Sequence, residues 1–161
     1  MKRALLALAA AALLGACRGG APVVTPLVGT PPNPPVQPVV IPPTANFELS
    51  ASETVASADD DLPAFFKVYV DNKEAGQTAI APKSKEKKWG AELPEGNHLF
   101  RFQAWVLPTP GEWTPLADGW QPPERFIRIE PGLKTVVTLR LYEGGRRHSL
   151  QIDRQPLTKP Q

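Results

Sequence analysis

The side chains able to do chemistry are few in this sequence and far apart. It contains two histidines, His98 and His148, and a single cysteine, Cys17. The histidines leave a Ser-His-Asp arrangement open, but there is no Gly-x-Ser-x-Gly elbow, the turn that exposes a nucleophilic serine in one large class of hydrolases. His98 lies in a Pro-x-Gly-x-His turn, where we expect it to make a structural hydrogen bond. We therefore expect a protein that is not an enzyme.

Metal ligands are not evident either. No set of His, Asp and Glu residues has the spacing typical of metal ligands. Asp59, Asp60 and Asp61 offer the oxygen ligands that calcium prefers, but the spacing of a calcium loop is missing. Runs of like charge are usually solvated loops, and we interpret both this acidic run and the basic run KSKEKK, residues 83–88, in that way. The sequence predicts no metal site and no cofactor.

Cys17 follows a segment typical of a secretory signal peptide. Lys2 and Arg3 precede eleven consecutive Ala and Leu residues, fewer than the roughly 20 apolar residues of a membrane-spanning helix. The run ends in Leu14-Gly15-Ala16-Cys17, which resembles the lipobox of bacterial lipoproteins. The resemblance implies cleavage after residue 16 and acylation of Cys17, with several acyl chains that together hold a protein firmly on a membrane.

Lipidation would also account for the solitary cysteine, because a secreted chain with one cysteine has no internal disulfide partner. The alternative is an ordinary signal peptide that happens to end beside a cysteine. Arg18 stands where many Gram-negative lipoproteins carry an aspartate that retains them in the inner membrane. The resemblance therefore implies a lipid-anchored protein of the cell envelope, in the outer membrane rather than the inner one.

Composition divides the chain beyond the signal peptide. The chain has 18 Lys and Arg against 16 Asp and Glu, and Lys2 and Arg3 account for the whole excess. A neutral mature chain gives no reason to expect nucleic-acid binding. Residues 22–43 contain nine prolines, which favour an extended, disordered tether because proline fixes φ and lacks an amide proton. We expect a signal peptide at 1–16, a lipidated cysteine and Pro-rich linker at 17–45, a folded domain at 46–153 and a tail at 154–161.

The folded part alternates apolar and polar residues with the period of two that is typical of strands. Residues 47–55 and 148–152 are weaker strand candidates, and turn signals separate the segments. Six to eight strands in about 110 residues predict an all-β, antiparallel β-sandwich. The strongest alternation predicts these buried faces: Phe66, Val68 and Val70; Phe100, Phe102, Ala104 and Val106; Ile127 and Ile129; Val137, Leu139 and Leu141.

The order of strands and turns over residues 66–142 resembles the PEGA domain, and an immunoglobulin-like or transthyretin-like sandwich fits nearly as well. The matching pieces are VYVDN, GQTA, LPEGNHLFRFQA, GW and RFIRIEPGLKTVVTLRL. Asn72 replaces the turn glycine. The replacement is acceptable because asparagine adopts the left-handed backbone conformation more readily than most residues. Ala79 replaces a proline, and residues 83–88 and 107–118 are insertions. The resemblance implies a module without catalytic residues that binds envelope components or acts as a spacer.

Three of the four tryptophans, Trp105, Trp113 and Trp120, lie in one proline-rich stretch. The same alternation places Phe65 and Trp105 on the outward face of their strands. Either the loop folds back and covers these aromatic residues, or the tryptophans form an exposed binding platform for a glycan or a protein. We expect Trp120 to be buried as a cap and Trp113 to be the more exposed.

These observations predict an envelope lipoprotein with a non-catalytic sandwich that binds or scaffolds an envelope protein or glycan. One alternative is a purely structural spacer or assembly subunit. A less favoured one is an accessory to an enzyme, which would need a polar cleft with converging histidine and acidic side chains.

Overall fold

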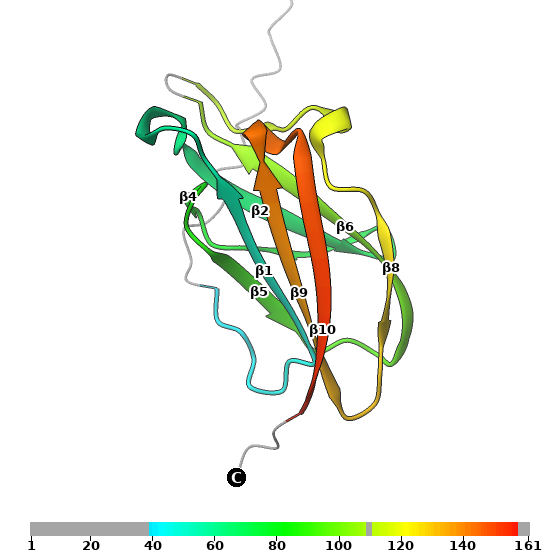
Figure 1. Cartoon of the computed structure of the whole chain (residues 1–161). Coiled ribbons are helices and arrows are strands. Elements are labelled where there is room, and N and C mark those ends of the chain that lie inside the picture. The colour runs from blue at the N-terminus through cyan, green and yellow to red at the C-terminus, as the bar shows by residue number, and fades with distance from the viewer. Residues whose placement is uncertain (1–38, 109–110, 158–161) are drawn as a thin grey trace, which may run out of the picture.

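The computed structural model describes residues 39–108 and 111–157, which fold into two β-sheets packed face to face. The predicted all-β sandwich is confirmed, and the only helical elements in the described part are three short 3₁₀ turns (Figure 1). These are η1 (Ala58–Asp60), η2 (Asp118–Trp120) and η3 (Glu143–Gly145).

Two sheets contain all the strands of the described residues. The first has the order β10-β9-β1-β5, and the second has the order β3-β2-β6-β7, with β4 also paired to β2 and β8 to β6. The bounds in the first sheet are β1 (Phe47–Thr54), β5 (Lys87–Ala91), β9 (Leu133–Tyr142) and β10 (Arg147–Pro156). Those in the second are β2 (Pro63–Val70), β3 (Lys73–Gln77), β4 (Ala81–Pro82), β6 (Gly96–Val106), β7 (Thr114–Pro115) and β8 (Arg125–Ile129).

The core lies between the sheets and is formed by the alternating residues that the sequence predicts. On β6 and β9 every predicted inward residue is buried, and on β2 Val70 is only half-buried. Phe47 of β1 stacks on Phe100 of β6 at 4.4 Å between ring centroids, which joins the two sheets directly. Burial of large aromatic and aliphatic side chains on two facing sheets is the main stabilising contribution in a domain without disulfides.

One pairing in the first sheet is parallel, although the sequence predicts antiparallel strands throughout. β1 pairs with β9 over eight positions, from Phe47 opposite Thr135 to Thr54 opposite Tyr142. Parallel strands end at the same edge of a sheet, so the segments that follow β1 and β9 emerge side by side. These segments contain η1 and η3, which lie together at one end of the sandwich (Figure 1).

The basic run at residues 83–88 is not a solvated loop throughout, and this expectation is wrong for its last part. Lys87 begins β5 and is only 1% exposed, and Trp89 of the same strand belongs to the core. Gly76 permits this packing, because a Cβ at that position would lie 2.5 Å from the indole nitrogen of Trp89.

The packed part of the chain starts before the expected boundary at residue 46. Val39 packs against the core, Ala45 is buried, and Ile41 lies so close to Gly90 that a Cβ there would meet its side chain at 2.6 Å. At the other end, β10 continues to Pro156, and Leu157 donates a hydrogen bond to the carbonyl of Gly132. Residues 1–38, which include the segment expected to be a signal peptide, Cys17 and most of the expected Pro-rich linker, lie outside the described residues.

Candidate functional site

A pocket of about 620 Å³ opens at the end of the sandwich where β1 and β9 finish. The parallel pairing of these strands explains its position, because it gathers the loops after both strands around one hollow. Its volume lies within the usual range of small-ligand sites. The lining combines apolar, acidic and basic side chains: Glu53, Thr54, Val55, Ala56, Asp60, Lys83, Tyr142, Glu143, Gly144 and Arg147.

Glu53 is the most deeply placed charged group of this pocket. It follows Leu49 and Ala51 on the inward face of β1, so the stripe of core residues ends in a carboxylate that is only 8% exposed. Burial raises the pKa of Glu53, and the nearby Lys83 and Lys87 oppose that shift only in part. Lys83 Nζ lies 3.8 Å from Glu53 Oε1, too far for a good hydrogen bond. The carboxylate can therefore still accept a hydrogen bond from a ligand.

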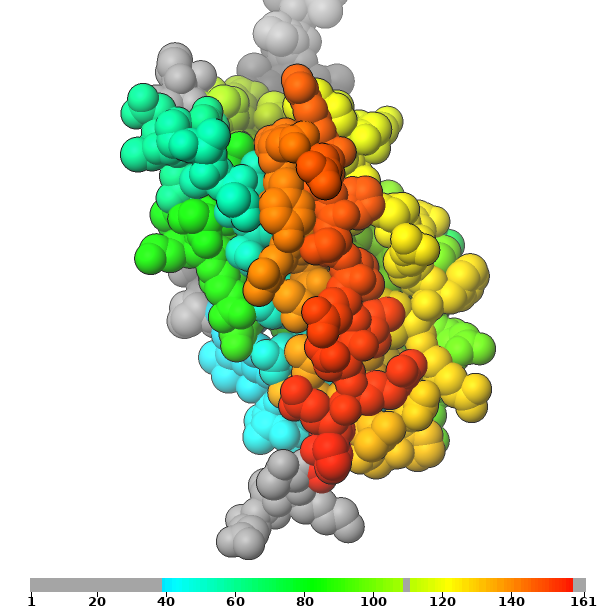
Figure 2. Space-filling view, in the orientation of Figure 1, coloured from blue at the N-terminus to red at the C-terminus, as the bar shows by residue number. Residues whose placement is uncertain are grey.

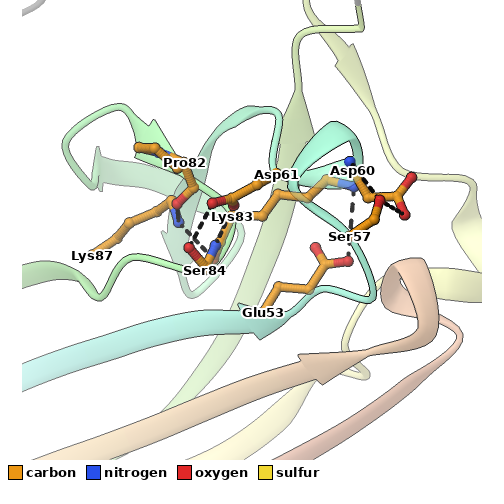
Figure 3. Close-up of polar contacts among 8 residues, drawn as sticks. All are labelled: Glu53, Ser57, Asp60, Asp61, Pro82, Lys83, Ser84 and Lys87. Atoms are coloured by element: carbon orange, nitrogen blue, oxygen red, sulfur yellow. Dashed lines mark hydrogen bonds and ion pairs between the residues drawn. The ribbon is translucent and has the colours of Figure 1, made fainter.

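Lys87 holds the wall of the pocket in place from behind. Its ammonium group donates to three carbonyls, those of Pro82 at 2.7 Å, Lys85 at 2.9 Å and Lys83 at 3.1 Å. Figure 3 includes Lys87 with two of these partners, Pro82 and Lys83. Desolvation lowers the pKa of Lys87 to about 8, and the charges of Asp61 and Glu53 act against that shift. These three hydrogen bonds close the turn that carries Lys83, and the side chain of Lys83 extends from this turn toward Glu53.

The acidic run at residues 59–61 fixes the opposite wall. Asp61 accepts from the amide and the hydroxyl of Ser84, at 2.8 and 2.7 Å, and these bonds lower the pKa of the carboxyl. Ser57 caps η1 by accepting from the Asp60 amide at 3.3 Å. Figure 3 shows the two walls meeting above Glu53. The run therefore ties loops together, and no cluster of three possible metal ligands occurs in the described part of the chain.

The predicted aromatic residues do not form one surface. Phe65 lies on the outward face of β2 but is only 1% exposed, because Trp105 stacks on it at 6.0 Å and Trp113 meets it edge-on at 5.0 Å. Gln121 pins the loop to β6 by bonding both the amide and the carbonyl of Ala104. Around Phe65, the loop acts as a cover, which is the first of the two alternatives.

Trp120 is separate from this cluster. It is 39% exposed, whereas Trp113 is half-buried, so the predicted order of exposure of these two tryptophans is wrong. The guanidinium of Arg146 lies 5.1 Å from the ring centroid of Trp120, which is a cation–π contact. Trp120 ends η2 and lies beside η3, near the pocket.

His98 makes the structural hydrogen bonds that its turn predicts. Its Nδ1 lies 2.7 Å from Asp71 Oδ2, and its Nε2 lies 2.9 Å from the carbonyl oxygen of Pro94. Both ring nitrogens face acceptors, so the doubly protonated ring fits best, and the bond to Asp71 is the main cause of a raised His98 pKa. Asp71 and Asn72 both have positive φ in the β2–β3 turn, where asparagine is well tolerated.

The sequence did not indicate the pocket. Its lining residues come from β1 and the loop after it, η1, the turn after β4, the end of β9, η3 and the start of β10, and the parallel pairing of β1 with β9 brings most of them together. A weak signal was available in Glu53, a charged residue at an inward position of an alternating segment.

No helix within residues 39–108 and 111–157 is long and apolar enough to cross a bilayer. Comparisons with protein-family models, with curated proteins and with solved structures found nothing that matches this chain.

Proposed function

We propose that this chain is a lipid-anchored protein of the bacterial cell envelope whose β-sandwich binds or holds an envelope protein or glycan without catalysing a reaction. Acylation of Cys17 would provide the anchor, and the Pro-rich segment would separate the sandwich from the membrane. The lipobox-like sequence at residues 14–17 supports the anchor. The turns that carry the PEGA resemblance support the module, since Asp71-Asn72 joins β2 to β3 and Gly96 opens β6.

The pocket at Glu53 is the observation that carries the binding part of this proposal. Binding sites typically combine an apolar lining with a few well-placed polar groups. Here, Val55, Ala56 and Tyr142 contribute the apolar surface, while Glu53 and Arg147 offer an acceptor and a donor. A projecting side chain or sugar of an envelope component that carries a hydrogen-bond donor could bind Glu53, whose ion pair with Lys83 is 3.8 Å long.

Affinity purification from solubilised envelopes tests this proposal. Ala56→Trp would fill the pocket from an exposed position without removing any buried contact. The matched control is Ala58→Trp, which changes an equally exposed alanine in η1 that does not line the pocket. We expect the wild type and Ala58→Trp to retain the same envelope component and Ala56→Trp to lose it, with unchanged thermal unfolding in all three. Equal retention by both variants would contradict a role for the pocket.

A further inference from the structure

β10 presents a long, regular and uncovered strand edge. It pairs with β9 over ten consecutive positions without a bulge. No described strand lies on its other side, and all its residues except Leu150 are exposed. Alternate backbone N–H and C=O groups on an edge strand point away from the sheet and form a template for another strand.

The other sheet edges are shorter or interrupted. β5 and β8 have five residues each, and Pro122 and Pro131 lie just outside β8. The pairing of β3 with β2 shifts register between Val68 and Tyr69. Short strands, prolines and bulges are among the means by which proteins prevent edge pairing, and charged side chains are another. Over the nine residues that precede Pro156, β10 has no proline and no bulge, and its charged residues Arg147, Asp153 and Arg154 include both signs.

The edge also borders apolar surface. Ile152 of β10 is 36% exposed and Phe126 of the neighbouring β8 is 77% exposed. Both line a groove of about 390 Å³ together with Leu150 and His148. Figure 2 shows β10, in red, running along this face of the molecule beside the gold and yellow residues of the β8 region. Exposed apolar surface next to unpaired backbone groups is typical of a contact site.

We propose that two copies of this chain associate through antiparallel pairing of their β10 strands about a two-fold axis at Leu150. With Leu150 opposite its own copy, Arg147 of each chain lies opposite Asp153 of the other, so two oppositely charged pairs form across one interface. Residues 147 and 153 share the outward face of the sheet, since Leu150 faces the core and side chains alternate along a strand. A self-complementary patch of this kind is what a two-fold interface requires.

Within residues 147–153, the same register places Ser149 opposite Gln151 and His148 opposite Ile152, with the two Leu150 side chains at the centre. Arg154 would face Arg146 of the other chain, but Arg146 lies outside β10 in a helical conformation and contacts Trp120, and Arg154 is paired with Glu130. A shift of the pairing by two residues would place Arg147 opposite Gln155 and remove both charge pairs. Arg147 now contacts Glu143 at 3.2 Å, but both side chains are largely exposed, so exchange of partners costs little. Charge complementarity therefore favours a second copy of this chain as the occupant of the edge.

Charge-reversal variants of the full chain test the proposal, with the molecular mass measured by analytical ultracentrifugation in mild detergent. At about 100 μM, a dimer with a Kd of about 10 μM would be mostly formed. Arg147→Asp and Asp153→Arg each place like charges opposite one another, and we expect each to weaken association at least about tenfold. The double variant restores opposite charges and should restore the dimer. Arg140→Asp, an exposed change on β9, is the matched control and should associate like the wild type.

A monomeric wild type at this concentration would overturn the proposal, as would a double variant no better than the single ones. A disulfide trap tests the register independently. Directly opposed residues in antiparallel strands have Cα atoms about 4.5–5.5 Å apart, within disulfide range. Leu150→Cys should therefore give a covalent dimer on oxidation, while Ile152→Cys, which faces residue 148, and the wild type with Cys17 alone should not. Equal cross-linking of all three would contradict the register.

Discussion

At the scale of single residues, the ionisation of His98 should affect the stability of the fold. Its raised pKa means that the folded state binds the proton more tightly than the unfolded state. The stabilisation is therefore complete at a pH below the ordinary histidine pKa of 6.5, and it disappears as the pH rises through the raised pKa of His98. We expect the urea midpoint of the wild type to fall between about pH 5.5 and about pH 8.5, and that of His98→Gln to change less.

Asn97→Gln is the control for this measurement, because Asn97 is an exposed, non-ionisable neighbour of His98 on β6. It should keep the pH dependence of the wild type. Identical pH profiles for the wild type and His98→Gln would contradict the assignment of a structural imidazolium at position 98.

Lys87 tests the packing behind the pocket. Lys87→Met keeps most of the side-chain volume but leaves three carbonyls without their donor. Hydrogen bonds from charged groups are strong, and the relief of a buried charge offsets only part of their loss, so we expect a cost of about 2–4 kcal/mol in unfolding free energy. Lys88→Met, at a side chain that is half exposed, should cost less than about 1 kcal/mol. Equal costs in urea titrations would show that Lys87 is not buried as described.

At the scale of elements, substitutions in the loop between β6 and β8 test whether its tryptophans cover the sheet or form an exposed binding platform. Trp113 packs edge-on against Phe65, so Trp113→Ala should open a cavity and cost about 2–4 kcal/mol. Trp120 is 39% exposed and contacts Arg146, so Trp120→Ala should cost only about 1 kcal/mol. Chemical denaturation of both variants checks this order. A larger loss for Trp120→Ala would mean that Trp120 is the buried cap that the sequence predicts.

The strands themselves could be predicted because their signal is local. Phe100, Phe102 and Ala104 alternate with polar residues, and one buried face is enough to produce that pattern. The turn at Asp71-Asn72 and the hydrogen bonds of His98 also follow from neighbouring residues.

The parallel pairing and the pocket could not be predicted in this way. Phe47 pairs with Thr135, although most of the domain's sequence lies between them, and nothing in either segment specifies the direction of pairing. Lys87 looked like part of a solvated run because its three carbonyl partners become visible only when the turn before β5 closes. Trp113 and Trp120 likewise differ in exposure because of where the loop folds, which their spacing does not encode.

At the scale of the whole molecule, the two proposed sites meet at Arg147, which lines the pocket and begins β10. The pocket lies at the end marked by η1 and η3, and β10 runs from that end along the side of the molecule (Figure 1). Antiparallel pairing about Leu150 would place the two pockets at opposite ends of the dimer. A two-ended dimer of this kind suits a protein that holds envelope components together.

Acylation of Cys17 tests the central claim, membrane anchorage, most directly. Wild-type and Cys17→Ser chains would be expressed in a bacterium that processes lipoproteins, labelled with palmitate and separated into membrane and soluble fractions. Serine offers no thiol to alkylate, so we expect label and membrane association in the wild type, and neither label nor cleavage before residue 17 in Cys17→Ser. Equal labelling of the two chains, or a wild type without label, would contradict the account.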